Sequence, residues 1–196
     1  MRRSRGFLLL LPLALALLAP ATSASADVET FVRFEEIATA NWLVTEQCQD
    51  GSTARTAVTA VAGREFESPD LDDVNTFATV LIRTRQCDGA QHILRASGPV
   101  AYSSSPSLME AHVTGTVPVL GSGGGEVTID VTWEGVGGLD TDVNQTRFDG
   151  FVGIFTSKTR DAVATGTVVL DGETLVSGPA LSAEIETLED RNRFLP

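Results

Sequence analysis

The chain contains few of the side chains from which most active sites and metal centres are built. Its 196 residues include two cysteines, two histidines, one lysine and one tyrosine. It has no Gly-x-Ser-x-Gly sequence for a serine nucleophile and no closely spaced Cys-x-x-Cys pair for redox or zinc chemistry. The glycine-rich run 121–125 lacks the lysine and the helix that complete a phosphate-binding loop. We therefore expect a protein that is not an enzyme and that has no cofactor.

Long apolar runs are absent after the first 26 residues. The chain opens with three arginines, continues with an apolar run from Phe7 to Ala19, and then has small residues up to Ala26. This run is shorter than the roughly 20 residues that span a bilayer, and the small residues fit signal peptidase. We predict a signal peptide over 1–26, cut between Ala26 and Asp27. The mature domain, 27–196, is then secreted or periplasmic and has no stable membrane anchor.

Basic residues are also scarce. Three of the 14 lie in the predicted signal peptide, so 11 basic and 26 acidic residues remain, giving the mature chain a net charge of −15. A surface this acidic repels nucleic acid and anionic lipid. The classes of partner that remain are a small molecule, a glycan and a protein.

Helical periodicity is nearly absent, and short runs rich in Val, Thr, Ile and Phe alternate with Gly, Asp, Ser and Pro. In the segment 126–134, apolar and polar residues alternate strictly, so that Trp133 and three aliphatic residues share one face. Trp42 also alternates with apolar residues, and we expect both tryptophans in the core. The same rule predicts about nine strands: 30–47, 53–66, 76–86, 90–97, 110–120, 126–136, 147–158, 161–170 and 180–188.

Short connections join these predicted strands, and several contain Asp-Gly, a strong turn former. Connections this short favour antiparallel neighbours. The prediction is a single all-β antiparallel domain, either a β-sandwich or a closed up-and-down barrel; alternation alone does not separate the two. The segment 147–158 is apolar on both faces, which predicts a central strand or one wall of an apolar pocket.

Cys48 and Cys87 each follow a predicted strand, next to an Asp-Gly turn. Export would bring them to an oxidising compartment, and the turns after the first and third strands of a meander lie at the same end of the sheet. In a flat sheet those strands are about 10 Å apart, whereas a disulfide needs Cα atoms within about 7 Å. We therefore predict a Cys48–Cys87 disulfide, for which either the two turns lean together or the sheet curls.

The two histidines lie on predicted strands that neighbour each other in sequence. If these strands pair, His92 falls near His112, and Glu110 shares a face with His112. Imidazole and carboxylate groups are suitable metal ligands. The alternation of residues, however, places the two rings on different faces, and we expect two ordinary strand histidines and no metal.

A second weak candidate for a metal site lies in the segment 139–146. Asp140, Asp142 and Asn144 resemble the start of an oxygen-rich calcium loop. An EF-hand also needs glycine at its sixth position and glutamate at its twelfth, where this chain has Gln145 and Phe151. We expect a solvated loop between two strands, with a looser calcium site as the alternative.

These observations favour a non-enzymatic binding or surface-interaction protein. One alternative is a β-barrel carrier of a small apolar ligand, which needs an enclosed cavity of several hundred Å³. A second is an extracellular hydrolase that uses two carboxylates, because acidic residues are plentiful.

Overall fold

The structure is a computed structural model that describes residues 30–67, 74–121 and 123–194. The predicted signal peptide and the bond between Ala26 and Asp27 lie outside these residues. The described part is all-β and contains no helix, and so offers no helix that is long and apolar enough to cross a membrane.

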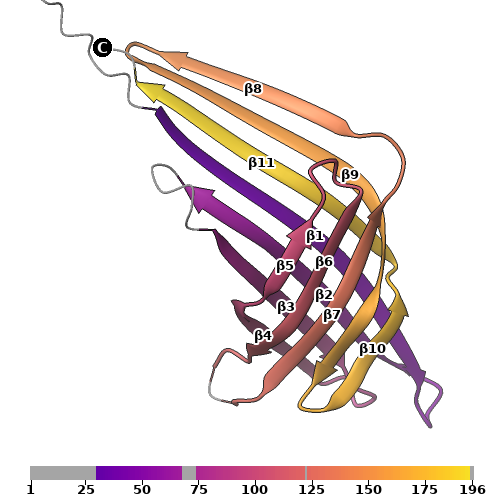
Figure 1. The fold of residues 1–196 in the computed structure, drawn as a ribbon. Helices are drawn as coiled ribbons and strands as arrows, with labels where there is room; N and C mark the ends of the chain where they lie inside the picture. The colour runs from indigo at the N-terminus through magenta and orange to yellow at the C-terminus, as the bar shows by residue number, and fades with distance from the viewer. Residues whose placement is uncertain (1–29, 68–73, 122, 195–196) are drawn as a thin grey trace, which may run out of the picture.

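Eleven strands form one antiparallel sheet (Figure 1). Along the sheet the strands follow the order β4-β3-β2-β1-β11-β9-β7-β6-β5, and β8 and β10 each pair with β9. The strand bounds are β1 Thr30–Gln47, β2 Thr53–Glu67, β3 Asn75–Arg85, β4 Gln91–Pro99, β5 Ala101–Ser104, β6 Glu110–Pro118, β7 Glu126–Gly135, β8 Asp140–Phe148, β9 Phe151–Leu170, β10 Glu173–Pro179 and β11 Ser182–Phe194.

The sheet curls so that β5, β6 and β7 lie over β1 to β4 (Figure 1). An isolated bridge between Ala96 and Val119 joins the two layers, and the amide of Leu120 donates to the carbonyl of Arg95 at 2.8 Å. These contacts connect the end of β6 to β4 at one point and not along a full ladder. The fold is therefore an open, barrel-like sheet and not a closed barrel.

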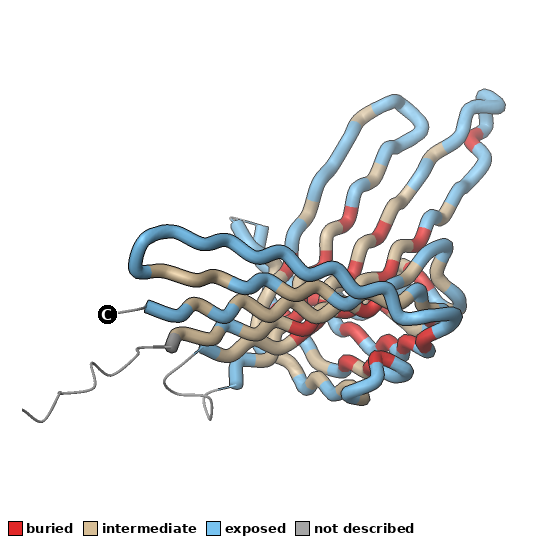
Figure 2. The backbone as a smooth tube through the Cα atoms, turned by 90° about the horizontal axis from the view of Figure 1, so that it is seen from above, coloured by how far each residue is buried: buried red, intermediate tan, exposed pale blue. Residues whose placement is uncertain are grey.

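The core lies between the two layers, and strand alternation explains its composition. On β7 the alternate residues Val127, Ile129, Val131 and Trp133 are all fully buried, as predicted. The indole of Trp133 donates to the carbonyl of Thr39 at 2.9 Å. Trp42 is also buried, which confirms the prediction for both tryptophans. Figure 2 shows that most buried residues lie in this two-layered part, which we call the body.

The prediction of nine strands misses three strands and divides a fourth, β9, into the segments 147–158 and 161–170. β5, β8 and β10 were not predicted, because β5 is serine-rich, β8 is mostly polar, and β10 is short. The segment 147–158 is not a strand by itself. Phe148 ends β8, Asp149 and Gly150 form the turn, and β9 then runs unbroken over 20 residues.

The predicted disulfide is confirmed. Cys48 and Cys87 are bonded with a Cα–Cα distance of 5.7 Å, at the ends of β1 and β3. Both cysteines lie beyond the strand ends Gln47 and Arg85, next to or in the turns, and these turns come closer together than next-nearest strands in a flat sheet.

Candidate binding face

One end of the sheet extends beyond the body as a single layer, which we call the wing. It consists of 30–36 of β1, 64–67 of β2, 140–148 of β8, 151–160 of β9 and 186–194 of β11, and it forms the upper part of Figure 1. All nine residues of β8 are exposed. In the described part of the chain, no second layer covers the wing, since β5, β6 and β7 overlie the body alone (Figures 1 and 2).

The inner face of the wing is the continuation of the face that forms the core. Because side chains alternate along a strand, the row that starts with buried Ala40 and Ala38 continues with Glu36, Phe34 and Val32. The strand register then identifies the neighbours of this row on the other strands.

Apolar side chains occupy the middle of this inner face. Phe34 stacks on Phe66, with ring centroids 4.8 Å apart. Across the face, Ile154 of β9 and Val143 of β8 have exposed fractions of 36% and 58%. The segment 147–158 was predicted to be a central strand or one wall of an apolar pocket. Its residues 151–158 are central in the sheet, because β9 runs between β8 and β11, but they lie in a single layer that is open to solvent.

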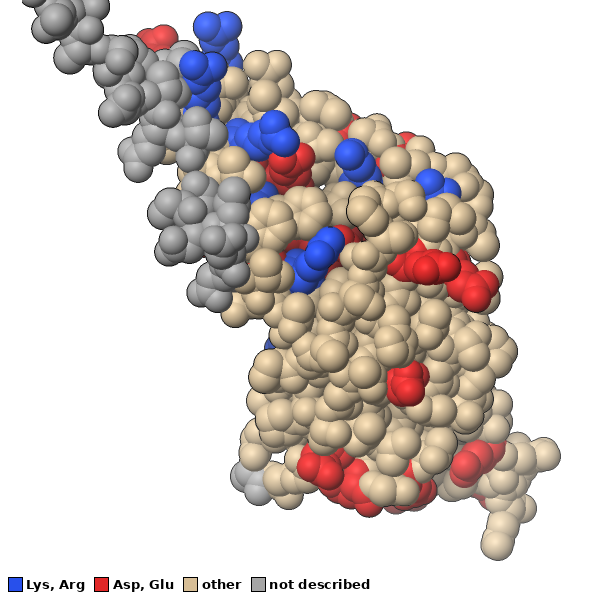
Figure 3. Space-filling model, viewed as in Figure 1, with Lys and Arg blue, Asp and Glu red and all other residues tan. Residues whose placement is uncertain are grey.

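Six cationic side chains surround and cross this apolar area. By register, they share the inner face: Arg64 on β2, Arg147 on β8, Lys158 and Arg160 on β9, and Arg191 and Arg193 on β11. They are more than half of the 11 basic residues of the predicted mature chain. Figure 3 shows Lys and Arg gathered over the wing, with a few Asp and Glu among them and more Asp and Glu over the body.

Two carboxylates lie on the inner face, and each has a cationic partner. Glu36 accepts from Arg64 Nη2 at 3.0 Å, and Glu189 pairs with Arg191. In the described part of the chain, no ion pair is found for Arg147, Lys158 or Arg193, and all three are exposed. The inner face is therefore a local region of positive charge on an acidic protein.

Glu36 lies where the wing meets the body, and it is only 1% exposed. Its Oε1 accepts from the hydroxyl of Tyr102 at 3.0 Å, while its Oε2 accepts from Arg64. Burial of Tyr102 and the adjacent negative charge of Glu36 raise the pKa of the phenol well above its usual value of 10.0. The hydroxyl therefore stays protonated and keeps its hydrogen bond, and β5 of one layer is tied to β1 of the other.

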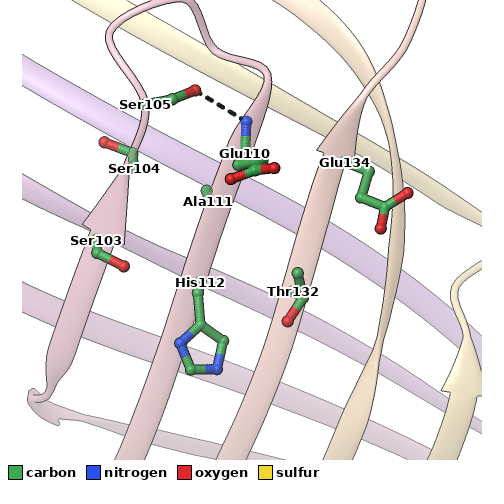
Figure 4. Close-up of a pocket in the computed structure, with 8 residues that line it drawn as sticks. All are labelled: Ser103, Ser104, Ser105, Glu110, Ala111, His112, Thr132 and Glu134. Atoms are coloured by element: carbon green, nitrogen blue, oxygen red, sulfur yellow. Dashed lines mark hydrogen bonds between the residues drawn. The ribbon is translucent and has the colours of Figure 1, made fainter.

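A separate pocket of about 270 Å³ lies against β5, β6 and β7 (Figure 4). Ser103 and His112 face each other across β5 and β6, and His112 Nε2 lies 3.0 Å from Asp130 Oδ1. Glu110 and Glu134 are also directly opposite and are exposed. The pocket is open to solvent, so it does not supply the dry environment in which such groups would be activated.

The structure does not bring His92 near His112, so that pairing is wrong. β4 pairs with β3, which puts His92 beside Thr84, whereas His112 of β6 lies between Ser103 and Thr132. The extra strand β5 separates the two segments that were expected to pair. Glu110 and His112 do share a face. No cluster of three potential ligands among His, Cys, Asp and Glu is found in the described residues.

Asp140, Asp142 and Asn144 do not lie in a loop, and that part of the prediction is wrong. They occupy alternate positions on the outer face of β8, where Asn144 Nδ2 donates to Asp142 Oδ2 at 3.1 Å. Calcium binding here stays an untested alternative, which the melting temperature with and without Ca²⁺ tests.

Sequence reasoning missed both Glu36 and the six inner-face cations. Glu36 had a signal, because it falls on the same alternating row as Phe34, Ala38 and Ala40. No sequence pattern indicated the six cations, because they lie on four strands that only the sheet register brings together.

Comparison with known proteins adds no assignment to this site. No family model matches the chain, and no curated protein matches it. A solved structure from Nitrosomonas europaea, which carries the provisional name AttH, is similar with a TM-score of 0.28 and 13% identity. The match covers 81% of this chain and 51% of that one, so this chain spans about half the length of its neighbour.

Proposed function

We propose that this is an exported, non-enzymatic binding protein that holds an acidic partner on the inner face of its wing. The observation that carries the proposal is the concentration of six cations on the inner face of the wing, in a chain with a net charge of −15 after the predicted cleavage. Three of them, Arg147, Lys158 and Arg193, are exposed. The disulfide is compatible with a secreted or periplasmic location, where such bonds persist.

The composition of the inner face supports a macromolecular partner. Protein interfaces combine an apolar centre with a polar rim, and aromatic residues and arginine are enriched in them. Here Phe34, Phe66 and Ile154 supply the apolar centre, and arginines and one lysine surround it. Five strands about 4.8 Å apart and up to about 30 Å long offer on the order of 600 Å², close to the roughly 800 Å² that each partner contributes to a standard interface.

The alternatives have less support. A carrier of a small apolar ligand needs an enclosed cavity. The described residues line three pockets of about 210 to 270 Å³, one shown in Figure 4, one beside Cys87 and one beside Trp42, and all three are open to solvent. A two-carboxylate hydrolase would use Glu110 and Glu134, which face each other in the open pocket of Figure 4.

The proposal is tested with poly-L-glutamate as the acidic probe and the mature chain as the binder. We expect binding in low salt that weakens as salt is added, because exposed charges are screened. The triple variant Arg147→Glu, Lys158→Glu, Arg193→Glu should lose at least tenfold in affinity. Because each substitution lies at an exposed position, the circular dichroism spectrum should stay unchanged.

The matched control reverses three exposed arginines on the outer face of the body: Arg55, Arg83 and Arg85. It changes the net charge by the same amount and should keep most of the binding. Equal losses in the two triple variants would show that only net charge matters, and would overturn the proposal. So would an absence of binding at low salt. Stronger binding to an anionic polysaccharide or to anionic vesicles would reject an acidic protein as the preferred partner.

A further inference from the structure

The edge of β8 differs from every other sheet edge in the described part of the chain. The bridge at Ala96 fastens β4 to the end of β6. β5 has only four residues, and β10 has seven, with a register shift and a terminal proline. β8, by contrast, pairs with β9 over nine residues without a shift, and nothing in the described chain pairs with its other side.

Such an edge is a template for another strand, because its outward N–H and C=O groups have no partner in the sheet. Proteins usually protect an edge of this length with proline, lysine, a bulge or a covering loop. The sequence of β8, DTDVNQTRF, contains neither proline nor lysine, and its protection is limited to three charged residues, Asp140, Asp142 and Arg147. Val143 and Phe148 are also exposed, at 58% and 68%, so apolar area is available beside the free backbone groups.

We infer that β8 is the edge through which two copies of this chain pair, antiparallel and centred on Asn144. A two-fold axis through this residue places all nine residues of one β8 opposite nine of the other. A closed contact of this kind uses the same strand in both copies, which is the usual form of a symmetric dimer interface.

The side chains match in this register. On the outer face, Asn144 meets Asn144 of the second copy, and Asp142 meets Thr146, a carboxylate acceptor opposite a hydroxyl donor. On the inner face, Val143 meets Gln145 and Arg147 meets Thr141. No like charges lie directly opposite each other. Like charges in that position would destabilise the pairing. The side-chain complementarity of β8 with itself is what selects a second copy over an unrelated extended peptide.

Pairing around an axis perpendicular to the sheet puts both inner faces on the same side. The two wings then form one continuous sheet, and the bodies lie at its two ends, because β8 points away from its own body (Figure 1). The inference does not depend on the proposed function, since Asn144 lies on the outer face and the six cations lie on the inner one.

Cysteine cross-linking tests the register. Both native cysteines are in the disulfide, so an added cysteine is the sole free thiol. Directly opposite residues have Cα atoms about 4.5 or 5.5 Å apart, within the range of a disulfide. Asn144→Cys should therefore form a covalent dimer rapidly under mild oxidation.

The controls are Asp142→Cys and Thr146→Cys, which are each about 13 Å from their own copies in this register and should not cross-link alone. A mixture of these two variants should give mixed dimers. Equal cross-linking of all three single variants would indicate random collision and overturn the register. The mature chain must also show a dimer mass in light scattering; a monomer at every concentration up to that of the cross-linking experiment overturns the inference.

A pair of charge variants gives a second measurement. Asn144→Lys places two positive charges opposite each other and should raise the dimer dissociation constant at least tenfold. Thr146→Lys faces Asp142 of the second copy and should leave dimerisation unchanged or strengthen it. If the two variants have equally raised dimer dissociation constants, the proposed pairing is wrong. Poly-L-glutamate binding by the Asn144→Lys variant reports separately on the inner face.

Discussion

The hydroxyl of Tyr102 donates to the buried carboxylate of Glu36 at 3.0 Å, and this bond joins the two layers of the sheet where the wing begins. Glu36 is also paired with Arg64, so three strands meet at one carboxylate. A buried carboxylate that accepts two hydrogen bonds is tolerated in the folded state, but removing either donor destabilises the fold.

The single tyrosine makes the alkaline behaviour of this bond directly measurable. Burial and Glu36 raise the pKa of Tyr102, so the folded state favours the protonated phenol while the unfolded chain ionises near pH 10.0. The stabilisation is therefore complete below pH 10 and is lost as the pH rises above it. We expect the tyrosinate absorbance near 295 nm to appear only together with unfolding. Ionisation near pH 10 with native tryptophan fluorescence would contradict this.

Replacing Tyr102 by phenylalanine should destabilise the fold by about 1–3 kcal/mol, because Glu36 loses one donor while staying buried. Urea denaturation at pH 7 measures the change. The variant should also lose the part of the pH dependence above pH 10 that belongs to Tyr102. A variant as stable as the parent protein would show that water replaces the hydroxyl at no cost.

Gly63 allows β1 and β2 to approach closely beside Glu36. A Cβ atom at this position would lie 2.1 Å from the carbonyl oxygen of Glu36, so the strands must move apart to admit it. We expect Gly63→Ala to cost about 1–3 kcal/mol, as overpacking does. Gly138→Ala is the matched control, since no atom lies within 4 Å of its added Cβ, and it should change the stability by less than about 0.5 kcal/mol.

The Cys48–Cys87 bond closes a separation of 39 residues, and its removal should matter mainly through the unfolded state. The chain-entropy model gives a loss of about 4 kcal/mol. Urea denaturation of the double variant Cys48→Ala, Cys87→Ala, compared with the oxidised parent, measures this loss. Equal midpoints for the two proteins would contradict the prediction.

The body was more predictable than the wing, for a physical reason. In the body, burial makes one face apolar, so β7 shows strict alternation and its buried residues could be listed from sequence. In β8 every residue is exposed, no face has to be apolar, and its nine residues resemble a loop. The Asp149-Gly150 turn was visible in the sequence but was read as part of a strand, because apolar residues flank it on both sides.

Almost none of the candidate site could be predicted from the sequence. Arg147, Lys158 and Arg193 are far apart in the chain or on different strands, and only the pairing of β8, β9 and β11 places them on one face. Net charge by itself pointed away from acidic partners. The net charge of the chain concealed the positive charge on the inner face of the wing.

The six cations on the inner face of the wing and the carboxylates on its outer face, among them Glu35, Glu65 and Asp142, give the molecule an electric dipole across the sheet. Because orientation in a field depends on this dipole as well as on net charge, the protein should turn as it nears a negatively charged partner and arrive with the inner face of the wing first. Collisions are then pre-oriented before any contact forms. Salt should slow this encounter more than it hastens dissociation.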